Sequence, residues 1–198
     1  MPLGAFKAAL MGTAGVSTTG DVVLLQTQTA SDSASISFTS GIDSTYGEYI
    51  FKFYNINNAT DHTDLVWQAN AAGGSGYNET ITSTSVTAYH NESGSDSTLA
   101  NTTAIDQAQG TAYENLTRDT GNDADANAAG ELHIFNPSST TYVKHFYSKT
   151  NSMNGDATAY CWTLLQAGYI NTTSAIDEIQ FKSSSGNFDG KIKLWGVK

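Results

Sequence analysis

One acidic loop has the residue types and spacing that could bind a metal ion. It runs from Asp119 to Asn127, and its carboxylate and amide side chains are the hard oxygen ligands that Ca²⁺ prefers. As an EF-hand the loop is incomplete, because Ala128 stands at the glycine position and Ile134 at that of the bidentate glutamate. The alternative is a solvated acidic loop, and we expect no metal or cofactor. The weak candidate ligands are Asp119, Asp123, Asp125 and Asn127.

The histidines and the single cysteine form no recognisable catalytic motif. His62, His90, His133 and His145 lack the paired spacing that supplies two metal ligands from one element. His133 and His145 lie on consecutive expected strands and could meet across a hairpin, but we favour the alternative that they are ordinary strand side chains hydrogen-bonded to their neighbours. Cys161 can form neither an internal disulfide nor a cysteine-rich zinc site, and its strand-like surroundings favour a small buried hydrophobe.

The chain also lacks the short motifs of hydrolases and nucleotide-binding enzymes. It contains no G-x-S-x-G nucleophile elbow, no P-loop and no dinucleotide fingerprint after a strand. A carboxylate pair for glycoside hydrolysis stays open, because a sequence does not show which Asp and Glu side chains converge. No pair stands out, so we expect a protein that is not an enzyme.

Charge and hydropathy exclude two classes of partner. The net charge is −10 and only nine residues are Lys or Arg, so the basic footprint of a nucleic-acid-binding protein is missing. No apolar run approaches the roughly 20 residues that span a bilayer, so no membrane partner is expected. The apolar N-terminal stretch is broken by Gly4, Lys7 and Gly12, unlike a signal peptide, and we expect an unprocessed chain made in the cytoplasm.

Aromatic side chains are the remaining candidates for a binding role. Ten Tyr residues occur in a chain of which only 14% is charged. A Tyr side chain can stack on a sugar face or anchor a protein interface, because it offers a large contact area at a low entropy cost. The alternative for any single Tyr is that it fills a β-core.

The elements that must position these residues are strands. Thr and aromatic residues favour pleated surfaces, while helix-favouring Glu and Lys are scarce. About ten alternating segments separated by turns are typical of an all-β fold, an antiparallel two-sheet sandwich of the jelly-roll type. The expected strands are Asp21–Thr27, Ala34–Thr39, Glu48–Ile56, Thr63–Asn70, Thr80–His90, Glu131–Asn136, Tyr142–Lys149, Ala159–Tyr169, Ala175–Lys182 and Lys191–Val197.

Two segments depart from the strand pattern. Apolar residues from Ile105 to Leu116 recur at roughly helical spacing, which predicts one short helix within residues 105–118. Residues 1–19 mix small apolar residues with glycine and show no alternation, which indicates an extended arm for assembly contacts. Residues 20–198 are then a single β-sandwich domain. The apolar residues assigned to the arm are Leu3, Phe6, Leu10 and Met11.

The C-terminal segment is expected to be integral to the sandwich. Phe188, Ile192 and Leu194 share one strand parity, which places them together on a buried face, and Trp195 lies on the opposite face. Removing this segment would leave a neighbouring strand with an unpaired edge.

Two segments resemble elements of small virion structural proteins of tailed phages, of the marine and cyanobacterial type. Gly130–Phe146, GELHIFNPSSTTYVKHF, is similar to a hairpin of that group. Ile176–Val197, with IQFKSSSGNFDG followed by IKLWG, resembles its closing hairpin. The similarity extends over most of residues 20–198, and the motifs that carry it are elements of the fold, not catalytic residues.

The resemblance implies a non-enzymatic structural component of a bacteriophage virion, made in the host bacterial cytoplasm and located on the virion surface. It leaves head, tail and fibre open. We favour an external head-decoration or fibre-like subunit that contacts other virion proteins as part of a homo-oligomer, a trimer or larger.

The alternative function is a carbohydrate-binding module that recognises host surface polysaccharide. One structural feature separates the two functions. A binding module should gather Tyr and Trp around a groove with Asp and Asn neighbours, whereas a decoration subunit should bury its aromatics in the core and in subunit contacts.

Overall fold

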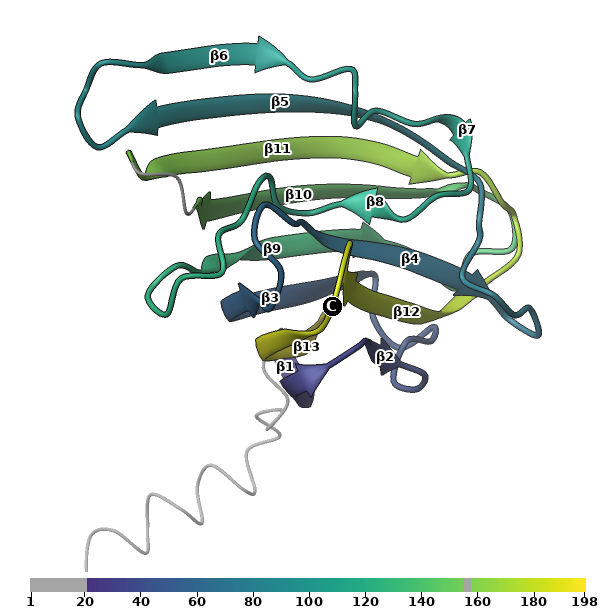
Figure 1. The fold of residues 1–198 in the computed structure, drawn as a ribbon. Helices are drawn as coiled ribbons and strands as arrows, with labels where there is room; N and C mark the ends of the chain where they lie inside the picture. The colour runs from purple at the N-terminus through teal and green to yellow at the C-terminus, as the bar shows by residue number, and fades with distance from the viewer. Residues whose placement is uncertain (1–20, 155–157) are drawn as a thin grey trace, which may run out of the picture.

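A computed structural model describes residues 21–154 and 158–198, and within them the chain is all β (Figure 1). No helix is present in this part of the chain, and so none is long and apolar enough to cross a membrane. The assigned arm residues Leu3, Phe6, Leu10 and Met11 lie outside the described residues. The strands are β1 (Val22–Ser33), β2 (Ile36–Phe38), β3 (Glu48–Asn58), β4 (Leu65–Ala71), β5 (Ile81–Asn91), β6 (Ser97–Asn101), β7 (Ala108–Gly110), β8 (Glu114–Asn115), β9 (Ala128–Phe135), β10 (Lys144–Met153), β11 (Tyr160–Ile170), β12 (Ile176–Ser183) and β13 (Phe188–Val197).

The strands form two antiparallel sheets that pack face to face. The larger sheet has nine strands in the order β1-β13-β3-β9-β10-β11-β5-β6, with β7 also paired to β5. The smaller sheet has four strands in the order β2-β12-β4-β8. In Figure 1 the smaller sheet lies in front of one half of the larger sheet, and β5 and β6 extend beyond its edge. Every residue of β6 is exposed, as expected for a strand that the smaller sheet does not cover.

Strict alternation along the strands builds the core between the two sheets. On β3, Tyr49, Phe51 and Phe53 are buried, because every second side chain points to the same face. Their partner from the smaller sheet is Phe181, whose ring centroid lies 5.1 Å from that of Phe51 and 5.4 Å from that of Phe53. The Phe53–Phe181 pair is edge-on, an arrangement that the quadrupoles of aromatic rings favour.

The prediction of a short helix within residues 105–118 is wrong. The segment forms β7 and β8, which pair with β5 and β4 respectively. Gln109 has a positive φ of 58°, which interrupts a right-handed helix, and Leu116 alone of its apolar residues joins the buried core. The backbone of this segment is therefore satisfied by long-range strand pairing, which local spacing does not reveal.

The two segments that carry the phage resemblance have different outcomes. β9 and β10, which include most of Gly130–Phe146, pair directly with each other, as expected of a hairpin. Ile176–Val197 does not form a closing hairpin, because β12 lies in the smaller sheet and β13 in the larger. The turn between them contains Gly186 with a φ of 73°, and through it the chain passes from one layer to the other.

The predicted parity of the last strand is confirmed. Phe188, Ile192 and Leu194 are buried on the core side of β13, and Trp195 lies on the opposite face.

Candidate functional site

The candidate site lies on the inner face of the larger sheet, where that face passes beyond the smaller sheet. Tyr160 and Trp162 at the start of β11 have the same parity as the buried Leu164 and Gln166. Tyr89 of β5 stands directly opposite Trp162 in the strand register. Alternation therefore directs these three aromatic side chains to the same face of the larger sheet as the core residues. They lie at a place on that face that the smaller sheet does not cover.

These three aromatic rings form one cluster. The centroids of Tyr89 and Trp162 are 4.5 Å apart, and those of Tyr89 and Tyr160 are 5.5 Å apart with the planes nearly perpendicular. The Tyr160 hydroxyl donates a hydrogen bond of 3.1 Å to Asp96. All three residues are partly exposed, so the cluster presents aromatic surface to a ligand as well as to its own members.

A polar cavity adjoins the cluster. It has a volume of about 300 Å³, and it is lined by His62, Asp64, Arg118, Asp119 and Trp162. Trp162 thus belongs both to the aromatic cluster and to the wall of the cavity. We call the aromatic cluster and this cavity together the aromatic groove.

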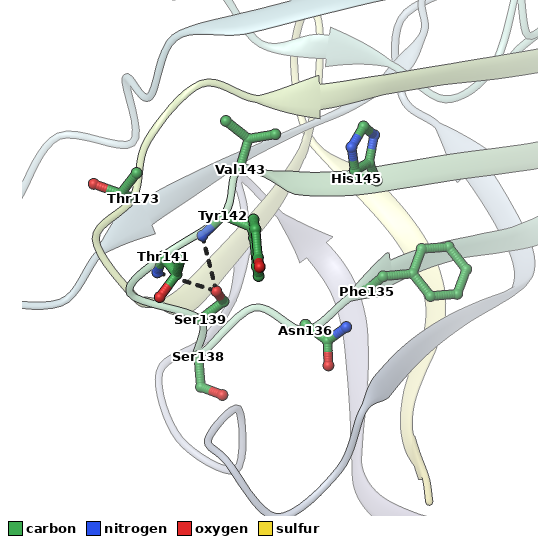
Figure 2. A pocket seen from close by; sticks show the side chains of 9 residues that line it. All are labelled: Phe135, Asn136, Ser138, Ser139, Thr141, Tyr142, Val143, His145 and Thr173. Carbon is green, nitrogen blue, oxygen red and sulfur yellow. Dashed lines mark hydrogen bonds between the residues drawn. The ribbon is translucent and has the colours of Figure 1, made fainter.

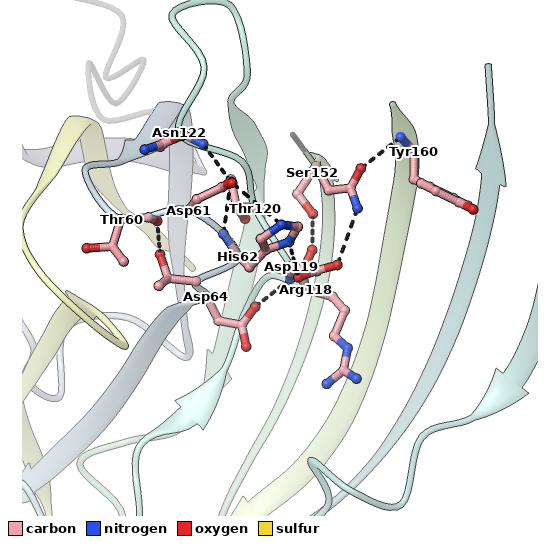
Figure 3. A network of polar contacts seen from close by, with 12 residues as sticks. Thr60, Asp61, His62, Asp64, Arg118, Asp119, Thr120, Asn122, Ser152 and Tyr160 are labelled. Carbon is pink, nitrogen blue, oxygen red and sulfur yellow. Dashed lines mark hydrogen bonds and ion pairs between the residues drawn. The ribbon is translucent and has the colours of Figure 1, made fainter. Parts of the chain in front are cut away.

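Two loops are held together to build the polar wall of the groove (Figure 3). Thr63 and Thr120 form an isolated antiparallel bridge, with backbone hydrogen bonds of 3.3 and 3.0 Å between them. His62 and Asp119, which flank this bridge, both have a φ of 54°. Asp and His are among the residues that tolerate the left-handed region, and two such residues side by side mark a local conformation that the surroundings must stabilise.

Asp64 is the most strongly held carboxylate in the groove. It accepts a hydrogen bond of 2.6 Å from the backbone N–H of Asp119 and another of 2.6 Å from the Asn115 amide. Burial raises the pKa of the Asp64 carboxyl above its ordinary value, although these hydrogen bonds and the nearby Arg118 charge act in the opposite direction. The Asp64 side chain is thus a fixed acceptor beside a guanidinium.

Asp119 contacts the groove through its side chain. One carboxylate oxygen lies 3.0 Å from His62 Nδ1, and the other accepts a hydrogen bond of 3.3 Å from the Asn154 amide. The other ring nitrogen of His62 lies 3.5 Å from the carboxylate of Asp61. The groove therefore presents carboxylate, imidazole and guanidinium groups within one small volume.

The structure brings only one of the four candidate calcium ligands into this site. Asp119 points to His62, whereas Asp123 and Asp125 lie exposed on the following turn. The amide of Asn127 donates to the backbone carbonyl of Asp125 at 3.3 Å. In residues 21–154 and 158–198, no group of three or more His, Cys, Asp or Glu side chains is placed to hold a metal ion.

His133 and His145, the two histidines that could have met across a hairpin, do not meet. His133 stands opposite Tyr147, and their rings stack at 4.3 Å, so His133 does not meet His145. Nδ1 of His133 lies 2.5 Å from a Glu48 carboxylate oxygen.

Cys161, expected to be a buried hydrophobe, is exposed and accepts a hydrogen bond of 3.0 Å from the Asn151 side chain. The correction follows from parity, because neighbouring Tyr160 and Trp162 occupy the inner face and leave the outer face to Cys161.

A larger hollow of about 810 Å³ lies beside the loop between β9 and β10 (Figure 2). It is lined by Phe135, Tyr142 and His145 together with small polar residues, and it has neither a carboxylate nor a guanidinium in its wall. The Ser139 hydroxyl accepts hydrogen bonds from the backbone N–H groups of Thr141 and Tyr142 at 3.2 and 3.0 Å. This side chain therefore stabilises its own turn, and the hollow has fewer groups to recognise a ligand than the aromatic groove.

The members of the aromatic groove come from segments far apart in the sequence. Asp64 precedes β4, Arg118 follows β8, and Trp162 lies on β11. The abundance of Tyr pointed to aromatic contacts in general, but nothing in the sequence pattern indicated that these three residues converge. Comparison of the chain with protein-family models, with curated proteins and with solved structures found no match.

Proposed function

We propose that this protein is a non-enzymatic binding protein that recognises a polysaccharide, such as a host surface glycan, through the aromatic groove. The observation that supports this most is the position of Trp162, which contacts Tyr89 and also lines the cavity with Asp64, Arg118 and Asp119. A cluster of Tyr and Trp at a groove with Asp neighbours is the feature expected of a carbohydrate-binding module.

The chemistry of a sugar matches both parts of the groove. The apolar C–H face of a pyranose ring can pack on the partly exposed rings of Trp162 and Tyr160, which offer a large apolar surface of fixed shape. The sugar hydroxyls can donate to Asp64 and accept from Arg118, and hydrogen bonds to charged groups are stronger than neutral ones. Few polar groups at fixed positions beside an apolar wall are typical of a small-molecule site.

Binding without turnover is part of the proposal. Hydrolysis of a glycosidic bond needs one carboxyl that can give up a proton to the leaving oxygen and a second that attacks or activates water. Both oxygens of Asp64 accept hydrogen bonds from protein groups, and so do those of Asp119 if the His62 ring is protonated at Nδ1. These carboxylates are therefore placed as acceptors for a ligand rather than as an acid and a nucleophile.

The experiment is a binding screen against purified bacterial surface polysaccharides, followed by calorimetry on any glycan that binds. Trp162→Ala should weaken binding roughly tenfold or more, because it removes the ring that joins the cluster to the cavity. Tyr142→Ala, which removes an aromatic side chain that is 74% exposed beside the larger hollow, is the matched control and should bind normally. Equal loss in both variants would contradict a site at the aromatic groove.

The same screen tests the absence of catalysis. If the protein released reducing ends from a glycan, and Asp64→Asn abolished this release, the site would be that of a hydrolase and the proposal would be wrong.

A second proposal follows from the resemblance, namely that the protein is a structural subunit on the surface of a phage virion, as a head-decoration or fibre-like component. The direct pairing of β9 and β10 is consistent with the hairpin that carries part of that resemblance. A net charge of −10 would help an abundant subunit to stay soluble before assembly. Imaging of particles labelled with an antibody against the chain tests this proposal, and unlabelled particles would contradict it.

A further inference from the structure

The outer face of the larger sheet, opposite to the aromatic groove, gathers an unusual share of the basic side chains. The chain has nine Lys and Arg residues and a net charge of −10. Four of the nine lie together on three strands of this face: Lys52 on β3, Lys149 on β10, and Lys191 and Lys193 on β13. A locally basic surface on a strongly acidic protein calls for a physical explanation.

The strand register places three of these lysines in a row. Lys193 stands directly opposite Lys52, Lys52 stands opposite Glu131 of β9, and Glu131 stands opposite Lys149. Since neighbouring strands lie about 4.8 Å apart, the row crosses four strands at right angles to their direction. Like charges directly opposite each other destabilise a sheet, so the pairing of Lys193 with Lys52 works against folding.

Little in the surroundings offsets this repulsion. Lys52 forms an ion pair of 3.3 Å with Glu131, whose own carboxylate also lies 3.5 Å from His133. The ammonium of Lys193 lies 5.3 Å from the centroid of the Tyr54 ring, a weak cation–π contact at an exposed site. Places where a sequence breaks a local rule without a compensating gain are where function is expected.

Two hollows turn this row into a groove. One, of about 470 Å³, is lined by Lys52, Tyr54, Glu131 and Lys149, with Ala129 and Gly130 among its small residues. The other, of about 420 Å³, is lined by Tyr54, Asn55, Lys191 and Lys193. Because Tyr54 lines both hollows and is 39% exposed, they adjoin across its ring. We call this surface the lysine groove; its defining residues are Lys52, Tyr54, Lys149, Lys191 and Lys193.

We propose that the lysine groove binds a linear anionic polysaccharide, one that carries carboxylate or sulfate groups along its chain. The spaced ammonium groups match a polymer with spaced negative charges, and Tyr54 at the centre offers a ring on which one sugar can stack. Asn55 and Asn151 line the hollows on either side. The Asn151 amide nitrogen donates to groups of β11, so its side-chain oxygen is the atom that can accept from a sugar hydroxyl.

This site is independent of the function proposed above, because the two grooves lie on opposite faces of the sheet and share no residue. A duplex nucleic acid fits the lysine groove less well, because it carries one negative charge per roughly 1.7 Å of its axis, which four lysines on a protein of net charge −10 cannot balance. An acidic protein segment is the remaining class of ligand, and the experiment is designed to separate it.

The test measures binding of the full chain to polygalacturonate, with dextran as the neutral comparison and poly-glutamate as the acidic polypeptide. Polygalacturonate should bind and dextran should not, and binding should weaken as salt rises because the charges are exposed. The double variant Lys149→Gln with Lys193→Gln should lower the affinity at least tenfold and make the salt dependence shallower. The matched control is Lys182→Gln with Lys198→Gln, which removes the same charge elsewhere and should change the affinity less than twofold.

Folding and site identity are checked separately. Lys193→Gln removes the repulsion with Lys52, so its melting temperature at low salt should equal or exceed that of the wild type. The proposal is overturned if dextran and polygalacturonate bind equally, if poly-glutamate binds and polygalacturonate does not, or if the control pair loses as much affinity. Loss of polygalacturonate binding in Trp162→Ala with retention in the lysine variants would assign the ligand to the aromatic groove and refute this inference alone.

Discussion

At the scale of single residues, Glu114 is an ionisable group that is fully buried between the two sheets. Its side chain has no exposed surface, and it accepts hydrogen bonds from Ser83 at 3.1 Å, from Gln107 at 2.8 Å and from Gln166. Burial, with a smaller contribution from nearby Asp106, raises the pKa of the Glu114 carboxyl from an ordinary value of 4.5 to about 7, although these hydrogen bonds act in the opposite direction.

The same network can accept the protonated carboxyl. The side-chain oxygens of Gln107 and Gln166 are buried and have no hydrogen-bond partner among the described residues. Because the oxygen and nitrogen of an amide can exchange places by rotation, either Gln could turn its oxygen to Glu114 and accept the carboxyl proton. Glu114 can thus lose or gain a proton without leaving its place between the sheets.

This environment predicts how stability depends on pH. Between pH 4.5 and about 7 the folded protein keeps a proton on Glu114 that the unfolded chain has lost. The free energy of unfolding should therefore fall as the pH rises through this window, by up to about 3 kcal/mol from this residue. Glu114→Gln should remove this contribution, so that urea unfolding shows the variant nearly equal to the wild type at pH 4 and more stable at pH 8.

The control for Glu114→Gln is Glu92→Gln, which makes the same substitution at an exposed position. Asp64, whose pKa is also raised, will leave some slope of the same sign in every variant. If the profiles of Glu114→Gln and the wild type run parallel, Glu114 does not titrate in this window.

At the scale of elements, β13 holds one end of the larger sheet together. It pairs with β3 on one side and with β1 on the other, and β1 is the edge strand of that sheet. Ile192 and Leu194 of β13 are fully buried in the core, and burying each side chain is worth about 1.5–3 kcal/mol. The strand thus supplies core contacts and also the partner of an edge.

Removal of residues 190–198 should therefore prevent folding to a soluble protein. The truncation takes away two core side chains and leaves both β1 and β3 with unpaired backbone groups, which favours aggregation. Removal of Lys198 alone is the control and should yield soluble protein. The soluble fraction and the thermal unfolding of the two chains check this, and a soluble truncation that melts cooperatively would refute the role given to β13.

At the scale of the whole molecule, the larger sheet presents different chemistry on its two faces. Its inner face carries the core and, beyond the smaller sheet, the aromatic groove with its carboxylates. Its outer face carries the lysine groove. A sheet that is covered on only part of one face can carry a different binding surface on each face. Alternation along every strand keeps the two sets of side chains apart.

The N-terminal arm, residues 1–19, is a prediction at this scale. Among the described residues, the members of the buried cluster run from Ala30 to Leu194. We expect that deletion of residues 1–19 leaves a chain that melts cooperatively, because the deletion keeps all of these core residues. Size-exclusion chromatography and incorporation into particles would then test the assembly role, which predicts loss of both oligomers and incorporation. A deletion that unfolds the protein, or that assembles normally, would contradict that role.

Local alternation was enough to predict the all-β class and the faces of the side chains. This was possible because alternation is a local property that depends only on residues two positions apart in the sequence. Phe188, Ile192 and Leu194 could be assigned to a buried face without knowledge of their neighbours, and the structure confirms that assignment. About ten strands were expected, and the described residues form thirteen, because β6, β7 and β8 were not foreseen.

Which segments meet could not be predicted in the same way, because it depends on long-range pairing. Residues 105–118 had the spacing of a helix, yet their backbone pairs with strands that lie far away in the sequence, and this pairing overrides the local pattern. The aromatic groove depends on the same kind of contact, since the bridge between Thr63 and Thr120 brings Asp64 and Arg118 together beside Trp162. Such pairings follow from the packing of the whole chain, because the free energy of each depends on partners that no local window of sequence contains.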